Sequence, residues 1–131
     1  MFGSLDVSTS ALVAQRTRLT AISANIAGAQ ALVNERGEYD PFRRRVAVLA
    51  QGDGRGGEGV HVAEILQEPK FRTVYEPNNP FADEQGNVQY PDINSSVEQI
   101  NAMEASRAYE ANIVAAEATK SMIQASLRLL A

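Results

Sequence analysis

The sequence INSSVEQINAMEASRAYEANIVAAEATKSMIQASLRLLA, residues 93–131, decides the fold of this chain. It contains neither proline nor glycine, so no residue in it would interrupt a helix. Ser95-Ser96-Val97-Glu98 fits a capping box, which predicts a helix start near Ser95. At about 1.5 Å per residue, the predicted helix is a rod roughly 50 Å long.

This predicted helix is apolar on two nearly opposite faces, and only a narrow stripe of Glu110, Glu117, Gln124 and Arg128 is clearly polar. A helix that is apolar on two sides must be covered from two sides, and a chain of this length is too short to supply both covers. The pattern therefore predicts an assembly subunit. Apolar positions near its start are Val97 and Ile100; one face then carries Ala108, Ala111, Ala115, Ala118, Met122, Ala125 and Leu129, and the other carries Ile113, Ala116, Ile123, Leu127 and Leu130.

Residues 4–33 predict a second long helix, because apolar residues recur every seven positions. A repeat sustained over four heptads is typical of a helix that packs on a partner helix. Gly28 interrupts the pattern at a cost of about 1 kcal/mol relative to Ala, so the helix either loosens or ends there, before Asn34 and Gly37 stop it. The repeat consists of Leu5, Leu12, Leu19, Ile26 and Val33, with Ser8, Gln15, Ile22 and Ala29 at the intervening steps.

The middle of the chain, residues 34–92, holds all five prolines and most of the glycines and predicts a β insertion. Residues 42–49, 60–66 and 71–75 have strand-like sequences, and the polar, glycine-rich residues 51–59 predict an exposed loop that joins the first two in a hairpin. Three prolines and Gly86 exclude a helix over residues 76–91 and indicate an extended strap. We therefore expect one domain of mainly α class, with terminal helices paired as a coiled-coil-like hairpin around a β-hairpin and a strap.

The composition excludes several classes of protein. A net charge of −4 gives no nucleic-acid signature, and the absence of cysteine excludes disulfides and thiolate chemistry. No stretch approaches the ~18 consecutive apolar residues of a membrane-spanning helix. The N-terminus lacks a basic region followed by a continuous apolar segment, so we do not expect a cleaved secretory signal.

Two motifs could carry chemistry, and both have a simpler interpretation. Gly52-x-Gly54-x-x-Gly57 matches the dinucleotide fingerprint, but a strand follows it instead of the helix N-terminus that a phosphate requires. His61 is the only histidine, so it cannot build a metal site of the usual ligand count or be paired with a nucleophile. The sequence predicts no catalytic, metal or cofactor site, and we expect a protein that is not an enzyme.

Arg43-Arg44-Arg45 is the one basic cluster. Without interleaved aromatic residues or a net positive charge, it predicts a solvated strand face or a salt bridge between subunits. Asn94-Ser95-Ser96 matches a glycosylation acceptor, but a role as a helix cap is sufficient to explain it.

Several stretches together resemble the bacterial flagellar axial proteins, the family of rod, hook and filament-junction subunits. The resemblance begins with Ser8, Ala11 and Leu12, continues through Asn25 and Ile26, and covers essentially the whole chain. Residues 79–93, with Tyr90 and Pro91, are similar to the corresponding strap of subunits of the proximal rod of the basal body. The segment Ser106-Arg107-Ala108-Tyr109 makes the likeness to those rod subunits specific. The chain departs from the family pattern at Gly28, where a second Asn is common.

The resemblance implies a structural subunit that is exported uncleaved by the flagellar type III apparatus. It would then polymerise helically with copies of itself and other rod proteins, forming the periplasmic shaft that transmits torque around the export channel. The basal-body rings and the export apparatus would be its neighbours. No cofactor, nucleic acid or membrane span is implied.

Within that assembly we expect the leucines of the first helix, with Ile22 and Ile26, to meet Ala108, Ala111 and Ala115 of the second. We expect the polar stripe of Glu110, Glu117, Gln124 and Arg128 to line the channel or a wetter contact. An alternative function is a cytoplasmic coiled-coil adaptor or secretion chaperone, which also needs long amphipathic ends. An isolated adaptor would be a discrete folded dimer, whereas an isolated rod subunit would be partly disordered at both ends.

Overall fold

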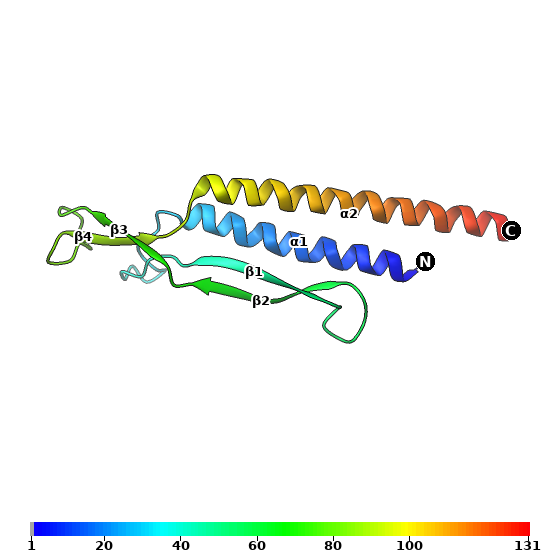
Figure 1. Cartoon of the computed structure of the whole chain (residues 1–131), viewed down its shortest axis with the longest axis horizontal. Coiled ribbons are helices and arrows are strands. Elements are labelled where there is room, and N and C mark those ends of the chain that lie inside the picture. Colours follow the sequence, from blue (N-terminus) through cyan, green and yellow to red (C-terminus); the bar gives the residue numbers. More distant parts are fainter. Residues whose placement is uncertain (1) are drawn as a thin grey trace.

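The computed structural model describes residues 2–131 as an elongated molecule built on two long antiparallel helices (Figure 1). Helix α1 lies between helix α2 and a β-hairpin, and a second β-hairpin extends from one end. The expected fold class, mainly α with a β insertion, is confirmed. The elements in chain order are α1 (Phe2–Gly28), β1 (Arg44–Gln51), β2 (Val60–Glu68), β3 (Phe71–Tyr75), β4 (Asn87–Pro91) and α2 (Ser95–Leu130).

Helix α2 runs unbroken for 36 residues, as the absence of proline and glycine predicts. Its cap is Asn94, whose side-chain oxygen accepts hydrogen bonds from the amides of Ser96 at 3.0 Å and Val97 at 3.3 Å. The expected capping box of Ser95 and Glu98 is therefore wrong, because Asn94 is the cap. The predicted start of the helix at Ser95 and the capping function of Asn94 are confirmed. Glu98 does not turn back to the cap because its side chain is directed into the molecule and paired there.

Helix α1 ends at Gly28 and not at residue 33. The ring of Phe42 packs against this end so closely that a Cβ on Gly28 would lie 2.5 Å from the ring. Glycine is therefore required for a close approach, and the chain turns away beyond it. Val33, the last member of the predicted heptad repeat, lies outside the helix in an isolated bridge with Tyr39.

The hairpin β1–β2 lies along α1 because α1 presents small side chains to it. Ala14 and Ala21 are buried, and the hydroxyl oxygen of Ser10 accepts a hydrogen bond from the amide of Val60 at 3.1 Å. A small residue at each of these steps lets a strand approach the helix backbone. α1 is thus covered on two sides within one chain.

Strands β1 and β2 pair antiparallel from Arg44 opposite Glu68 to Gln51 opposite Val60, with a register shift between Val48 and Leu49. The extra residue of such a bulge bends the strand and increases its twist. The hairpin that the sequence predicted is confirmed, with both strands ending about two residues later than expected.

The glycine-rich tip of this hairpin holds no vacant anion cradle. The carboxylate of Asp53 accepts hydrogen bonds from the amides of Arg55 at 2.7 Å and Gly57 at 2.8 Å, which are the donors that a phosphate would need. These bonds lower the pKa of Asp53. The ring Nδ1 of His61 lies 2.8 Å from the carbonyl oxygen of Gly52, so this histidine has the structural role that its isolation predicted.

The segment expected as an extended strap is a second hairpin, which is a correction to the sequence prediction. Strands β3 and β4 pair from Phe71 opposite Pro91 to Tyr75 opposite Asn87, and Val88 is fully buried. Proline content concealed this strand, but Pro91 stands at its last position, where a missing amide is tolerated. In the connection between these strands, the ring of Phe81 stacks on Tyr39 from the loop after α1, with centroids 5.3 Å apart.

Within residues 2–131, neither helix combines the length and the hydropathy needed to cross a membrane.

We expect Gly28→Ala to lower the free energy of unfolding by about 1–3 kcal/mol, because the added methyl group forces Phe42 off the end of α1. Chemical denaturation followed by circular dichroism at 222 nm measures this change. Gly3→Ala is the matched control, since a Cβ there meets no atom within 4 Å. A Gly28→Ala protein as stable as the parent would contradict the role assigned to this glycine.

Candidate assembly site

A buried carboxylate joins both helices and the first hairpin. The side chain of Glu98 on α2 belongs to a residue that is only 1% exposed. Its Oε1 accepts a hydrogen bond from Nε of Arg44 on β1 at 2.6 Å, and its Oε2 accepts one from Nδ2 of Asn25 on α1 at 3.3 Å. Arg44 also donates to Glu68 on β2 at 3.3 Å. Four elements therefore meet at one ion-paired cluster.

The side chain of Asn25 hydrogen-bonds to the open edge of β1 in the way that a neighbouring strand would. It is 0% exposed, its Oδ1 accepts from the amide of Arg45 at 2.7 Å, and its Nδ2 donates to the carbonyl of the same residue at 2.8 Å. A primary amide offers the donor and acceptor pair of a peptide group, which a carboxylate or a hydrocarbon does not. Asn25 thereby fixes the position of the hairpin on α1.

The cluster is charged, although it is largely removed from water. Burial disfavours the charge on the Arg44 guanidinium, but the hydrogen bonds and charges of Glu98 and Glu68 outweigh this effect, so the pKa of Arg44 is raised. Loss of Arg44 would leave the Glu98 charge buried without a cation, whereas loss of Glu98 would leave Arg44 with Glu68 as its remaining partner.

The residues of α2 that pack on α1 recur every seven positions, starting from Glu98. Glu98, Ala105 and Thr119 are buried, and Asn112 between them is half-buried. On α1, Ile22 is buried and the heptad leucines are half-buried, whereas Ile26 is exposed. A second, half-buried row on α2 consists of Ala102, Tyr109, Ala116 and Ile123.

Within one chain, α1 does not cover Ala111 and Ala115, so a contact of the α1 leucines with this face stays a prediction for the assembly. Ala111, Ala115, Ala118 and Met122 are exposed, and Ala108 is half-buried. The rotation of α2 about its axis explains this, because Glu98 must be directed at Arg44 and Asn25. Exposed positions among the predicted packing residues also include Val97, Ile100, Leu127 and Leu130.

Some residues that carried the family resemblance are buried inside the chain, and others lie on its surface. Ser8, Asn25 and Pro91 are buried, whereas Arg107 is exposed. The structure thus gives Asn25 a specific role, but it brings the signature residues to no common site. Half-buried members are Ala11, Leu12, Tyr90, Ser106, Ala108 and Tyr109.

Sequence reasoning missed Glu98 because the capping box accounted for it, and it misplaced Arg44 on a solvated face or between subunits. The available signal was the spacing of seven from Glu98 to Ala105, which places a carboxylate in line with a small apolar residue on one face of the helix. A charged residue in such a position requires a buried partner, and an arginine-rich strand offers one.

The arrangement offers no chemistry beyond packing and pairing. No group of three or more His, Cys, Asp or Glu side chains within the described residues 2–131 could hold a metal ion. The long, partly uncovered helices are the remaining candidate for function.

No protein-family model matches the chain, but curated relatives match it over nearly its whole length. It is 34% identical to the flagellar basal-body rod protein FlgC of Bacillus subtilis, over 98% of this chain and 97% of that protein. The chain belongs to the FlgC family of flagellar basal-body rod proteins. The FlgC proteins of Salmonella typhimurium and Yersinia enterocolitica are 39% and 36% identical to it, each over 95% of this chain and 93% of the relative.

Membership of the FlgC family confirms the resemblance drawn from the sequence and makes this chain a structural protein of the flagellar basal-body rod. It also confirms the expectation of a non-enzymatic function, since the FlgC relatives are named as rod proteins. The glycine motif and His61 therefore need no catalytic explanation.

A second polar cluster lies in the β3–β4 hairpin and includes Tyr90. The carboxylate of Glu76 accepts hydrogen bonds from the Asn79 amide at 3.0 Å and the Tyr90 hydroxyl at 2.8 Å. These bonds, in that order, lower the pKa of Glu76, and the bond to Glu76 raises the pKa of Tyr90. The cluster joins the start of the connection after β3 to strand β4.

For the Glu98 cluster, we expect Glu98→Ala to lower the free energy of unfolding by about 1.5–3 kcal/mol, because Arg44 loses its nearest partner and keeps Glu68 alone. Denaturant titration of the purified chain measures the loss. Glu110→Ala, at an exposed position of the same helix, should change stability by less than about 0.5 kcal/mol. Equal effects of the two substitutions would show that Glu98 contributes no more to stability than an exposed glutamate does.

For the second cluster, the direction in which stability changes with pH follows from the pKa shifts of Glu76 and Tyr90. The contribution of Glu76 is present above its ordinary pKa of 4.5 and is lost as the pH falls through its lowered value. The contribution of neutral Tyr90 is present below its ordinary pKa of 10.0 and is lost as the pH rises through its raised value.

We therefore expect Glu76→Gln to lower the pKa of one of the four tyrosines, as measured by phenolate absorbance during an alkaline titration. Glu84→Gln, an exposed substitution in the same hairpin, should leave the titration unchanged. Identical curves for the parent and Glu76→Gln would show that the Tyr90 bond does not form in solution.

Proposed function

We propose that this chain polymerises helically through its terminal helices to form part of the proximal rod. The observation that carries the proposal is the apolar face of α2 that remains uncovered after α1 has covered the other. We call this face the outer stripe. It consists of Ile100, Met103, Ala111, Val114, Ala115, Ala118, Met122, Ala125 and Leu129, with Arg107 among them, and every one of these residues is exposed.

The spacing of the outer stripe suits packing between long, nearly straight helices. Ile100, Ala111 and Met122 are separated by 11 residues, and the same spacing relates Met103, Val114 and Ala125. Eleven residues in three turns is close to the natural period of an α-helix, so the stripe stays on one side with little supercoiling. One neighbouring helix could therefore follow it for most of the length of α2.

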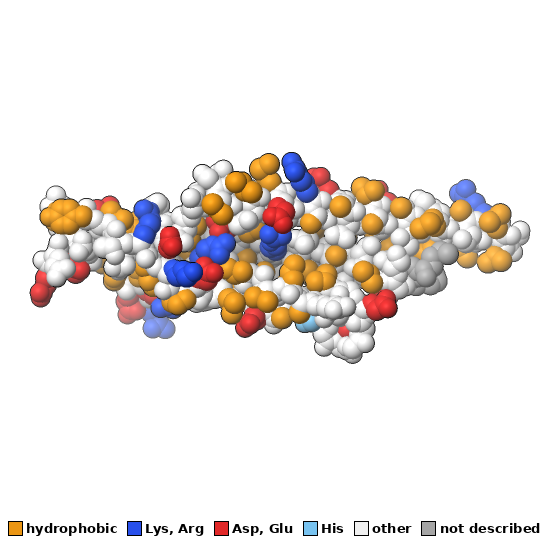
Figure 2. Space-filling model, in the orientation of Figure 1, with side chains coloured by type: hydrophobic (Ala, Val, Ile, Leu, Met, Phe, Trp, Pro, Cys, Tyr) orange, Lys and Arg blue, Asp and Glu red, His pale blue; other side chains and the backbone are white. Residues whose placement is uncertain are grey.

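The stripe also has the composition of a packing surface. Figure 2 shows apolar side chains along the edge of the molecule that α2 forms, where no part of the chain covers them. Burial of each large side chain among them would stabilise an assembly by about 1.5–3 kcal/mol, while the alanines permit close approach of the partner backbone. A monomer that leaves this surface in water is incomplete.

In the assembly that we propose, the terminal helices pack as coiled coils around the export channel, and the β-hairpins lie towards the outside. The rod then acts as the shaft that transmits torque, so its mechanism is the rigidity of helix packing. Copies of this chain, other rod proteins, the basal-body rings and the export apparatus are its partners. We infer that it reaches the periplasmic space uncleaved through the flagellar type III pathway.

The polar stripe of Glu110, Glu117, Gln124 and Arg128 is exposed on α2 beside the outer stripe. We assign it to the channel or to a hydrated contact, because charged side chains lose least where water remains. The alternative of a cytoplasmic adaptor accounts for two long helices, but it gives no role to the β3–β4 hairpin or to family membership.

We expect Ala118→Glu, and likewise Ala115→Glu, to block rod assembly and swimming, because each places a charge in the proposed helix contact. Both positions are exposed in the monomer, so expression and export should be unaffected. Swimming in soft agar and immunoblots of purified basal bodies measure the effect.

Gln124→Glu is the matched control, since it adds the same charge to the same helix within the polar stripe. It should swim normally. Normal swimming by the Ala115 and Ala118 variants as well would overturn the assignment of the packing surface.

A further inference from the structure

The β3–β4 hairpin, residues 71–91, is an arm that stands apart from the rest of the chain. α1 packs against α2 and against both strands of the first hairpin, whereas β3 and β4 pack mainly against each other. Figure 1 shows the arm extending beyond the end of the two helices. Two short links hold it there: residues 69–70 lead from β2 into β3, and residues 92–94 lead from β4 into α2.

The two links lie side by side, since the amide of Asp92 donates a hydrogen bond to the carbonyl of Lys70 at 3.2 Å. Hinges in proteins are a few residues of this kind, at the ends of elements, that absorb changes in the backbone angles. Two adjacent links permit the arm to swing about them unless a further contact fixes its angle.

Tyr39 provides this further contact, because it binds the arm at two places. Its hydroxyl accepts a hydrogen bond from the Gln89 amide at 3.0 Å and donates one to the Gln89 carbonyl at 3.1 Å, on the outer edge of β4. Its ring stacks on Phe81 in the connection between β3 and β4, with the two ring planes 16° apart. Among the described residues 2–131, no other side chain outside the arm forms a hydrogen bond or a salt bridge with it.

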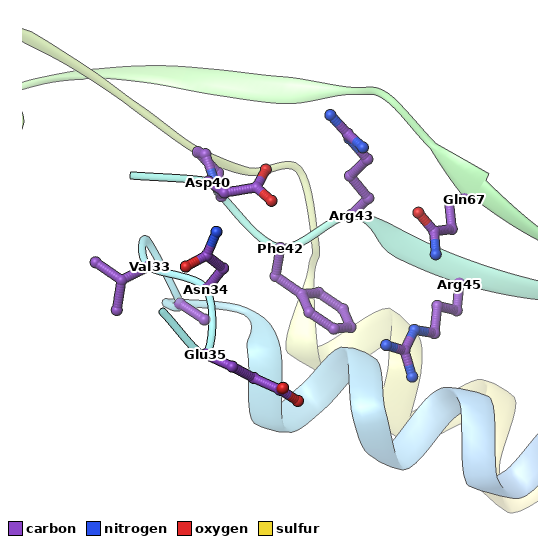
Figure 3. A pocket seen from close by; sticks show the side chains of 10 residues that line it. Val33, Asn34, Glu35, Asp40, Phe42, Arg43, Arg45 and Gln67 are labelled. Carbon is purple, nitrogen blue, oxygen red and sulfur yellow. The ribbon is translucent and has the colours of Figure 1, made fainter. Parts of the chain in front are cut away.

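The loop that carries Tyr39 is itself fixed to the end of α1. Tyr39 pairs with Val33 in the isolated bridge, and the amide of Phe42 donates to the carbonyl of Ala31 at 3.1 Å. Figure 3 shows Phe42 directed towards the last turn of α1, where its ring lies against Gly28. Tyr39 therefore connects the arm to α1 by a path separate from the two links.

We propose that Tyr39 is the residue that positions the arm, and that assembly of the rod requires the angle it sets. The proposal rests on the rod function inferred above. In a helical polymer each subunit meets its neighbours in the same way, so a contact of the arm is repeated only if every arm leaves its helices at one angle. A swinging arm would lose conformational entropy whenever such a contact formed, and the contact would be weaker.

A tyrosine suits this position because it combines two kinds of contact. The phenol hydroxyl both donates and accepts, so a single group satisfies the amide and the carbonyl of Gln89. The flat ring adds a stacking contact of specific geometry. Phenylalanine would keep the stacking and lose both hydrogen bonds, whereas alanine would lose all three contacts, so the two substitutions grade the loss.

Spin labels on introduced cysteines measure the angle of the arm, because the chain has no cysteine of its own. The arm pair is Ser23→Cys on α1 with Glu84→Cys in the arm. The control pair is Ser23→Cys with Gln51→Cys at the end of β1, and all three positions are exposed. Double electron–electron resonance on the purified chain gives the distribution of distances between the labels of each pair.

We expect the arm pair to give one narrow distribution in the parent chain, a several-fold broader one in Tyr39→Ala and one of intermediate width in Tyr39→Phe. The control pair should be unchanged in both variants. Tyr75→Phe is the matched substitution, since Tyr75 lies in the same arm but is 70% exposed, and it should leave the arm pair narrow. If Tyr39→Ala broadens the control pair as well, Tyr39→Phe decides the result.

Swimming in soft agar tests whether the rod requires the fixed angle. The Tyr39→Ala chain should be exported normally but give a several-fold smaller swimming zone, with a smaller loss for Tyr39→Phe. An arm pair as narrow in both Tyr39 variants as in the parent would overturn the positioning role, and so would a broad arm pair beside a narrow control pair in the parent. A broadened arm with normal swimming would overturn the need for a fixed angle, while leaving the rod function and the outer stripe intact.

Discussion

The buried carboxylate of Glu98 is the constraint on which the rest of the structure depends. Arg44 and Asn25 bind its two oxygens from different elements, so α2, α1 and the first hairpin cannot be displaced independently. A buried ion pair of this kind contributes little net stability but penalises every arrangement that separates its members. Its effect here is to fix one rotation of α2 and one position of the hairpin.

The fixed rotation of α2 divides its surface between two different periods. The seam that begins at Glu98 repeats every seven residues and faces α1, whereas the stripe that begins at Ile100 repeats every 11 and faces outwards. A period of 3.5 residues favours a left-handed supercoil, and a period of 3.67 is close to that of a straight helix. The helix is thus suited to a short twisted partner within the chain and to long straight partners outside it.

The sequence predicted the elements better than their contacts. The uninterrupted run after Pro91 and the heptad leucines revealed both helices, and strand alternation revealed the first hairpin. The two apolar faces of α2 were also visible, but periodicity alone does not tell which of them packs on α1. The partners of Glu98 decide which face turns inward, and they lie 54 and 73 positions away in the chain. The β4 strand was missed for a similar reason, since its pairing with β3 outweighs the local signal of the prolines.

The unequal lengths of the helices extend the same reasoning from the monomer to the polymer. α1 and α2 contain 27 and 36 residues, so no antiparallel register can cover the inner seam of α2 completely. The Glu98 cluster sets the register at the end next to the second hairpin, so the part of α2 that α1 cannot cover lies at the opposite end. The interaction that completes the fold of one chain therefore also leaves the leucines of its last turns exposed. Exposed leucines that continue a covered helix face favour burial against another molecule.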